Sequence, residues 1–144
     1  MHEPVIVQLS RKEVLAAVDQ GVRDHLNDIG DRFQSLRVGA ITSWDVPINE
    51  ALATAAVIKW LNGRTDVKAR SALKDYGNLI IRETDPSGEI ICLVSCLPPQ
   101  FKIEGFIRVH EAQAKHDCLK QTLAGRRWWI SKDMLHDPRE LGNG

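Results

Sequence analysis

Hydrophobic residues first recur at helical spacing between residues 10 and 30 of the chain. They follow one another at intervals of three and four, and charged residues fill the opposite side, as in an amphipathic helix. Ser10 and Glu13 have the spacing of a capping box, in which each side chain accepts a hydrogen bond from the other residue's backbone N–H. The pattern predicts a helix over about 10–30, preceded by a short strand or extended segment at 5–9.

The second predicted helix, over 47–62, is apolar on nearly every side. Pro47 suits its first turn, and Gly63 suits the position just past its end. Glu50 projects on the same side as Val57 and Leu61, so its carboxylate is expected near the interior. A buried charge needs a partner or a metal ion, and Glu50 is therefore a candidate functional residue.

After Gly63 the helical spacing gives way to short apolar runs separated by turn residues. We expect strands at 67–73, 79–82, 89–95, 101–109 and 126–131, a further short strand at 37–41, and a short helix over 110–121. The turn residues at 85–88 predict that strands 79–82 and 89–95 form an antiparallel hairpin. The sequence thus indicates an α/β fold of the α+β kind, a mixed and largely antiparallel sheet flanked by helices. We expect one domain over 1–144, with the core at about 44–141 following the N-terminal helix.

The composition narrows the class of protein without naming a function. Hydrophobic residues make up 43% and charged residues 26% of the chain, which is typical of a globular domain. No apolar run approaches the roughly 20 residues that span a bilayer, and the start of the chain does not resemble a signal peptide, so we expect a cytoplasmic protein with no membrane partner. The three cysteines include no C-x-x-C pair, which favours reduced thiols.

Charge argues against a strongly basic nucleic-acid binder, because 19 lysines and arginines balance 19 aspartates and glutamates. A modest basic segment lies between residues 64 and 82, which contain five lysines and arginines but only two acidic residues. The two consecutive tryptophans after Arg126 and Arg127 are a second candidate, because aromatic rings stack on bases while arginines hold phosphates. Side chains alternate along a strand, so one of Trp128 and Trp129 is expected in the core. The candidate nucleic-acid contacts are Arg64, Lys74, Arg126 and Arg127.

Glu50, Asp66 and Arg70 have the residue types that metal-dependent phosphodiester cleavage requires. Carboxylate oxygens hold Mg²⁺ or Mn²⁺, the metal activates water, and a nearby cation stabilises charge on the phosphate. A zinc site is an alternative, because several cysteines and histidines follow later in the chain, although their spacing matches no compact zinc motif. The candidate ligands are Cys92, Cys96, His110, His116, Asp117 and Cys118. Buried core cysteines are the simpler interpretation of Cys92 and Cys96.

Five segments of the chain carry a family resemblance: NEALATAAVIKWLN, TDVKAR, YGNLIIRETD, EIICLVSCLPPQFKIEGFI and RRWWISKDML. Together they resemble a family of small proteins found largely in phages and prophages, whose pattern is similar to the PD-(D/E)XK nuclease core. The resemblance implies a nuclease-like fold, a host cytoplasm, and metal binding by Glu50 and Asp66, with Arg70 closing the motif. Lys68 departs from the pattern, because it stands where a second acid or glutamine is expected.

Three functions remain open from the sequence, of which the third is a purely structural or assembly role as a homo-oligomer. Either Glu50 and Asp66 hold one Mg²⁺ or Mn²⁺ ion in a hydrolase that cleaves nucleic acid, with Arg70 and Lys68 beside the metal, or the site has decayed. In the second case the fold is a binding module for nucleic acid or a host protein, in counter-defence or assembly. A lysine at position 68 repels a metal ion and thereby weighs against the first function.

Overall fold

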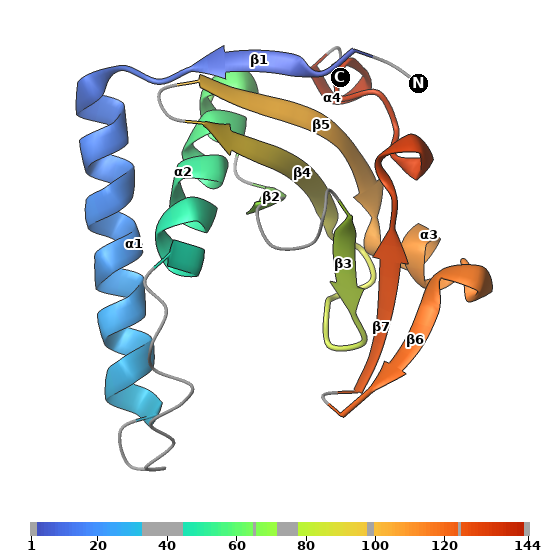
Figure 1. Ribbon diagram of the computed structural model, residues 1–144. Coiled ribbons are helices and arrows are strands. Elements are labelled where there is room, and N and C mark those ends of the chain that lie inside the picture. The colour runs from blue at the N-terminus through green and yellow to red at the C-terminus, as the bar shows by residue number, and fades with distance from the viewer. Residues whose placement is uncertain are drawn as a thin grey trace.

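The computed structural model describes residues 3–32, 45–64, 66–71, 78–97, 100–123 and 125–142 (Figure 1). In chain order the elements are β1 (Val5–Gln8), α1 (Arg11–Arg32), α2 (Asp45–Trp60), β2 (Val67–Ser71), β3 (Leu79–Arg82), β4 (Ile90–Leu97), β5 (Gln100–Arg108), α3 (Val109–Gln113), the 3-10 helix η3 (His116–Cys118), β6 (Leu119–Thr122), β7 (Gly125–Ile130), the 3-10 helix η4 (Lys132–Met134) and α4 (Arg139–Gly142).

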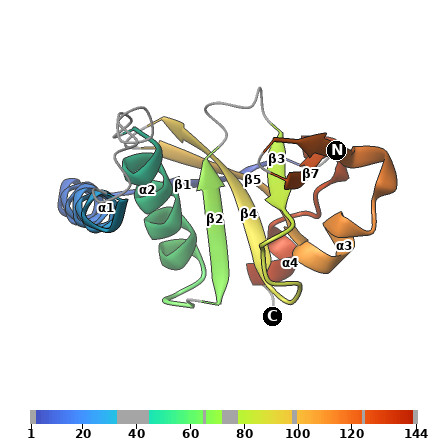
Figure 2. The ribbon, with the colours of Figure 1, turned by 90° about the horizontal axis from the view of Figure 1, so that it is seen from below.

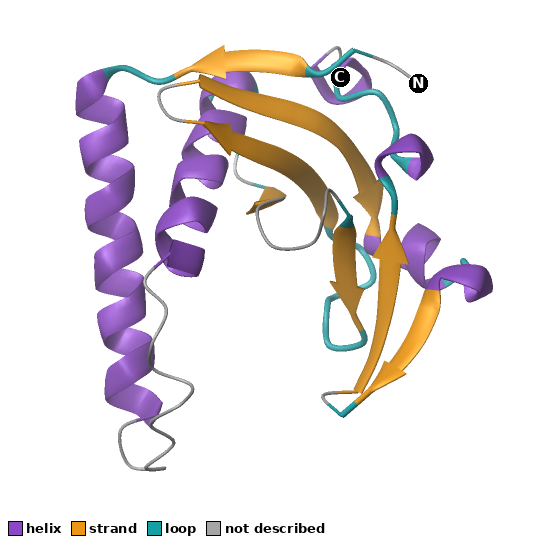
Figure 3. Ribbon diagram, in the orientation of Figure 1, coloured by secondary structure: helices purple, strands orange, loops and turns teal. Residues whose placement is uncertain are grey.

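The strands form two sheets. The first sheet has the order β1-β5-β4-β2, in which β2 runs parallel to β4 and the other neighbours are antiparallel. The second sheet has the order β3-β7-β6 and is antiparallel throughout. Figure 3 shows α1 and α2 at one side of the molecule and the second sheet at the other. The predicted α+β class with mixed and antiparallel sheets is therefore confirmed.

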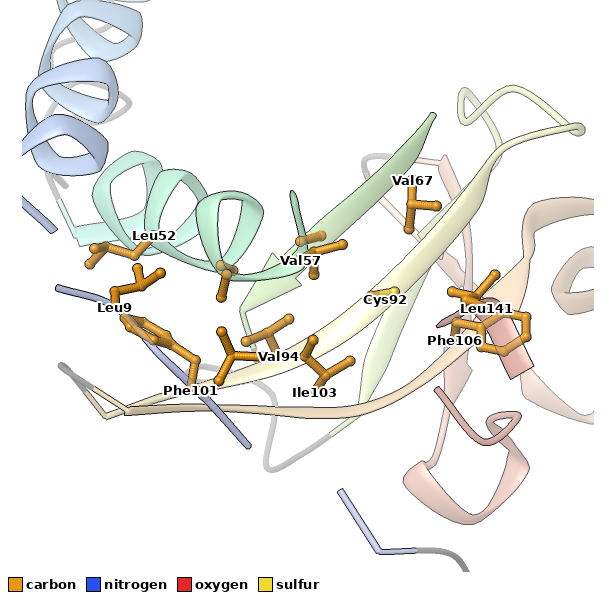
Figure 4. Close-up of a cluster of buried hydrophobic side chains, with 14 of the residues drawn as sticks. Leu9, Leu52, Val57, Val67, Cys92, Val94, Phe101, Ile103, Phe106 and Leu141 are labelled. Atoms are coloured by element: carbon orange, nitrogen blue, oxygen red, sulfur yellow. The ribbon is translucent and has the colours of Figure 1, made fainter. Parts of the chain in front are cut away.

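Strand β4 is buried on both faces, which explains its continuous apolar sequence. Cys92 and Val94 belong to a first core, where they pack with Leu52, Val57 and other residues of α2 (Figure 4). Ile91 and Leu93 point to the opposite face and belong to a second core. That core joins the two sheets and α3 through Leu79, Ile81, Ile107, Ala112, Trp128 and Ile130.

Helix α1 begins with the predicted capping box. The backbone N–H of Ser10 donates to Glu13 Oε1 at 2.8 Å, and the N–H of Glu13 donates to Ser10 Oγ at 3.2 Å. Lys59 of α2 adds a 2.8 Å ion pair to the same Glu13 oxygen, and its Nζ also donates to the carbonyl of Gln8 at 2.8 Å. This contact fixes the start of α1 against α2, and Figure 2 shows α1, viewed end-on, on the side of α2 away from β2.

Helix α2 ends at Trp60, two residues before the predicted end, and the turn that follows includes the predicted glycine. Asn62 adopts φ 58° and Gly63 φ 89°, a left-handed conformation that glycine accepts readily. The N–H of Gly63 donates to the carbonyl of Ile58 at 2.8 Å, a hydrogen bond that closes the last helical turn. The chain then reverses, and β2 runs back beside α2 in the opposite direction (Figure 2).

Two expectations about local structure were wrong. Strands β3 and β4 do not form a hairpin, because β3 pairs with β7 in the second sheet while β4 pairs with β2 and β5. The helix expected over 110–121 is only the five residues of α3, and β6 occupies the end of that range. The strand expected at 37–41 and residues 72–73 of the next strand lie outside the described residues. Among the described helices, none is long and apolar enough to cross a membrane.

Candidate functional site

Arg70 is held by a structural ion pair. Its Nη1 and Nη2 donate to the two carboxylate oxygens of Asp85 at 2.9 and 2.7 Å, and Nη1 also donates to the carbonyl of Ile80 at 2.6 Å. The side chains of Arg70 and Asp85 are only 22% and 11% exposed. Burial raises the pKa of the Asp85 carboxyl, but the Arg70 guanidinium and the backbone N–H of Arg82 outweigh burial and lower that pKa below its ordinary value. Arg70 therefore joins β2 to β3.

Asp66 and Lys68 are each engaged by another charge. Arg64 Nε and Nη2 donate to the two oxygens of Asp66 at 2.6 and 2.9 Å, and this hydrogen bonding lowers the pKa of the carboxyl. The Asp66 side chain is 57% exposed. Lys68 Nζ lies 2.6 Å from Glu89 Oε1. Both oxygens of the predicted metal ligand Asp66 thus already accept hydrogen bonds from an arginine.

Glu50 is exposed, whereas the sequence placed its carboxylate near the interior. The first buried residue on the side of the helix that carries Glu50 is Ala53, nearly one turn later, so Glu50 lies beyond the buried part of this side. The protein around the Glu50 carboxyl removes enough water to raise its pKa, against the attraction of Arg70 and Arg82. Glu50 therefore lies in the electrostatic field of these two arginines, near the end of β2.

Glu50 and Asp66 belong to opposite ends of the α2–β2 unit. At 1.5 Å per residue the helix rises roughly 15 Å from Glu50 to Trp60, and Asp66 follows at the far end, before β2 begins. Figure 2 shows the start of α2 beside the end of β2. The placement does not fit one metal ion shared by both carboxylates, and no described group of three His, Cys, Asp or Glu residues is arranged to hold a metal. Cleavage with Mg²⁺ or Mn²⁺ remains a prediction.

The residues of the alternative zinc site do not lie together either. Cys92 belongs to the first core and Cys118 to the second, and the side chain of Cys96 lies outside the described residues. Burial raises the pKa of the Cys92 thiol to about 12, so this sulfur stays protonated. Cys92 is thus a core residue, as its position on an apolar strand indicated.

The second sheet carries three cations directly opposite one another on its three strands. Arg82 of β3 pairs with Arg127 of β7, and Arg127 pairs with Lys120 of β6. Residues opposite each other in antiparallel strands project from the same face. None of the three side chains forms an ion pair with an acid in the part of the chain that the structure describes. We call Arg82, Arg127 and Lys120 the basic row.

Trp129 lies on the same face as the basic row. It is two residues after Arg127 on β7 and opposite Ile80 of β3. Lys120 Nζ lies over the Trp129 ring, 4.7 Å from its centroid, which confirms that the two side chains share a face. Trp128 points the other way and is buried at 5% exposure. The expectation that one tryptophan of the pair belongs to the core is confirmed.

No family model matches this chain, and no curated protein or solved structure is significantly similar to it. The resemblance to a phage family and to a nuclease core therefore remains a prediction.

The four predicted nucleic-acid contacts have different surroundings. Arg127 belongs to the basic row, whereas Arg126 projects from the other face, where its Nε lies 3.2 Å from Glu83 Oε2. Arg64 is engaged by Asp66, and Lys74 lies outside the described residues. Sequence reasoning missed Arg82 and Lys120 as partners of Arg127, because strand register and the existence of β6 bring these three together.

Proposed function

We propose that this protein binds nucleic acid, without cleaving it, through the face of the second sheet that carries the basic row. Three like charges directly opposite one another are unfavourable for a folded sheet. A bound polyanion removes this repulsion, because its phosphates place negative charge between the cations. The basic row is the observation that carries the proposal.

A neutral net charge is compatible with this function, because several acids are paired with cations outside the basic row, while Glu50 and Asp85 attract Arg82 only without forming an ion pair with it. Asp66, Asp85 and Glu89 are each ion-paired with a cation outside the basic row. The opposing charges therefore cancel within local pairs, while the positive charge of the basic row is left uncompensated by short ion pairs. Local distribution, more than total charge, decides where a polyanion is attracted.

The decayed-site alternative fits this proposal better than metal-dependent cleavage does. Arg70 stabilises the fold through its ion pair with Asp85, and both carboxylate oxygens of Asp66 accept hydrogen bonds from Arg64. The proposed function consequently contains no metal-dependent step. We expect labelled oligonucleotides to remain intact in the presence of Mg²⁺ or Mn²⁺, and binding to be unchanged by EDTA.

The test measures fluorescence anisotropy of labelled oligonucleotides as salt is increased. Contacts with three phosphates predict a slope of log affinity against log salt of about −2 to −3. A variant with Arg82, Arg127 and Lys120 all changed to Gln should lose most of the affinity and most of this slope. An affinity that stays flat with salt in the wild-type protein would rule out phosphate contacts.

A matched control removes the same charge from elsewhere on the surface. Arg11, Lys12 and Lys102 are exposed, and none forms an ion pair with a described acid. Changing these three to Gln gives the same net charge as the basic-row variant. The proposal predicts nearly full binding in this control, and an equal loss in both variants would show that only overall charge matters.

A further inference from the structure

The half-buried Trp129 ring lies beside the basic row on the same face of the second sheet. Residues two apart on a strand are about 7 Å apart, so Trp129 lies roughly that far from Arg127 along β7. Neighbouring strands are about 4.8 Å apart, so the backbone of the basic row spans roughly 10 Å across the sheet. An indole ring and three cations therefore lie within the dimensions of a few nucleotides.

The orientation of the indole leaves its apolar part for a ligand. Trp129 Nε1 is buried and has no hydrogen-bond partner, so the polar edge of the ring points away from solvent. Lys120 provides a cation 4.7 Å from the ring centroid. A base that takes the place of the Lys120 ammonium over the ring would bring its own phosphate beside that ammonium group, so stacking and charge neutralisation can occur together.

We infer that the nucleic acid is single-stranded and that one of its bases stacks on Trp129. This inference rests on the proposed function and specifies its ligand. In a duplex each base is already stacked between its neighbours, so a duplex offers phosphates to the basic row but no base face to the indole. Single strands offer both, and sheets with exposed aromatic residues commonly bind them in this way. The basic row attracts the strand, and Trp129 selects unpaired bases.

The experiment compares labelled single-stranded and double-stranded oligonucleotides of equal length by fluorescence anisotropy. The variants are Trp129→Leu, Trp129→Phe and the control Trp60→Leu, which removes a half-buried tryptophan of α2. Loss of one base stack predicts about 5- to 150-fold weaker single-strand binding for Trp129→Leu, with duplex binding nearly unchanged. Trp129→Phe keeps an aromatic face and should retain most of the affinity, and Trp60→Leu should bind as the wild type does.

A second measurement does not depend on any variant folding correctly. A single-stranded DNA that contains 2-aminopurine is mixed with the wild-type protein, and stacking on Trp129 should quench its fluorescence. A matching RNA distinguishes the two kinds of single strand, and tighter binding of either supports the inference.

The outcomes separate the two proposals. Equal affinity for both forms, with no effect of Trp129→Leu and no quenching, would overturn the single-strand inference and leave the proposed function intact. Binding of neither form would overturn both, and an acidic protein partner would then better explain the basic row.

Discussion

Changing Asp85 to Asn tests whether the Arg70 ion pair stabilises the fold. The carboxylate of Asp85 accepts two hydrogen bonds from Arg70, at 2.9 and 2.7 Å, and one from the backbone N–H of Arg82 at 2.7 Å. Asparagine is nearly the same size but has one acceptor oxygen and no charge. The variant therefore leaves the Arg70 guanidinium partly buried without its anion.

The expected loss follows from the burial of the pair. Exposed ion pairs contribute about 0.2–1 kcal/mol, whereas removing one partner of a fully buried pair costs about 3–5 kcal/mol. Exposed fractions of 22% and 11% place this pair between the two cases, nearer the buried one. We expect Asp85→Asn to lower the free energy of unfolding by about 2–3 kcal/mol, which corresponds to a decrease in Tm of about 5–10 °C.

The assay is urea unfolding of the wild type, Asp85→Asn, Arg70→Met and the double variant. The double variant should regain about 1–2 kcal/mol relative to Asp85→Asn, because it no longer contains an uncompensated charge. Asp66→Asn is the matched control, since its bidentate arginine pair is much more exposed and its loss should be much smaller. A loss below about 0.5 kcal/mol for Asp85→Asn would refute the structural role of Arg70.

The pH dependence of this contribution has a definite sign. The pKa of Asp85 is lower in the folded protein than its ordinary value of 3.8. The stabilisation is therefore complete above pH 3.8 and is lost as the pH falls further, through the folded-state pKa. The difference in stability between the wild type and Asp85→Asn should be constant near neutral pH and shrink only below about pH 4.

Three other predictions address separate parts of the molecule. Arg127→Gln should raise the free energy of unfolding by about 0.5–1 kcal/mol at low salt, because the middle cation of the basic row repels both neighbours. The same variant should bind oligonucleotides more weakly. A gain in stability that persists at high salt would contradict charge repulsion as the cause. Gly125→Ala should lower the free energy of unfolding by about 1–2 kcal/mol, because φ is 107°, a conformation that residues with a Cβ rarely adopt; an unchanged Tm would contradict this. NMR titration should find the Glu13 pKa at about 2, because the hydrogen bond from Lys59 lowers it, and a wild-type midpoint near 4.5 would contradict the contact.

The helices could be predicted from sequence because their signals are local. The capping box at Ser10 and Glu13 and the glycine after α2 each act within a few residues, and both have the expected geometry. The turn before β4 is also local, and the N–H of Glu89 donates to the carbonyl of Pro86 at 3.1 Å. The partner of β3 could not be predicted, since its pairing with β7 is set by the apolar faces of two distant segments.

The candidate site was harder to predict for the same reason. The residue type suggested that Arg70 stabilises a phosphate. Its role in the fold depends instead on its ion pair with Asp85, which is distant in the sequence and belongs to no motif with Arg70. The basic row depends on register, because a shift of β7 by one residue would turn Arg127 to the other face and bring Arg126 to this one. Neighbours in sequence therefore indicated Arg127 as a contact and Arg82 as part of the basic segment over 64–82, whereas only the strand register places these two beside Lys120.

The pairing of β1 with β5 has a consequence for biosynthesis. Val5 lies opposite Ile103, so roughly 100 residues of chain separate the two partners, and such distant pairing forms slowly. At about 5–20 residues per second, β1 leaves the ribosome roughly 5–20 s before β5 has been made. During that interval β1 has no strand to pair with, and the apolar face of α2 has no sheet from β4 and β5 to cover it. A nascent chain of this protein therefore exposes the sheet-facing side of α2 until β5 appears, which makes this side a surface for a chaperone to cover.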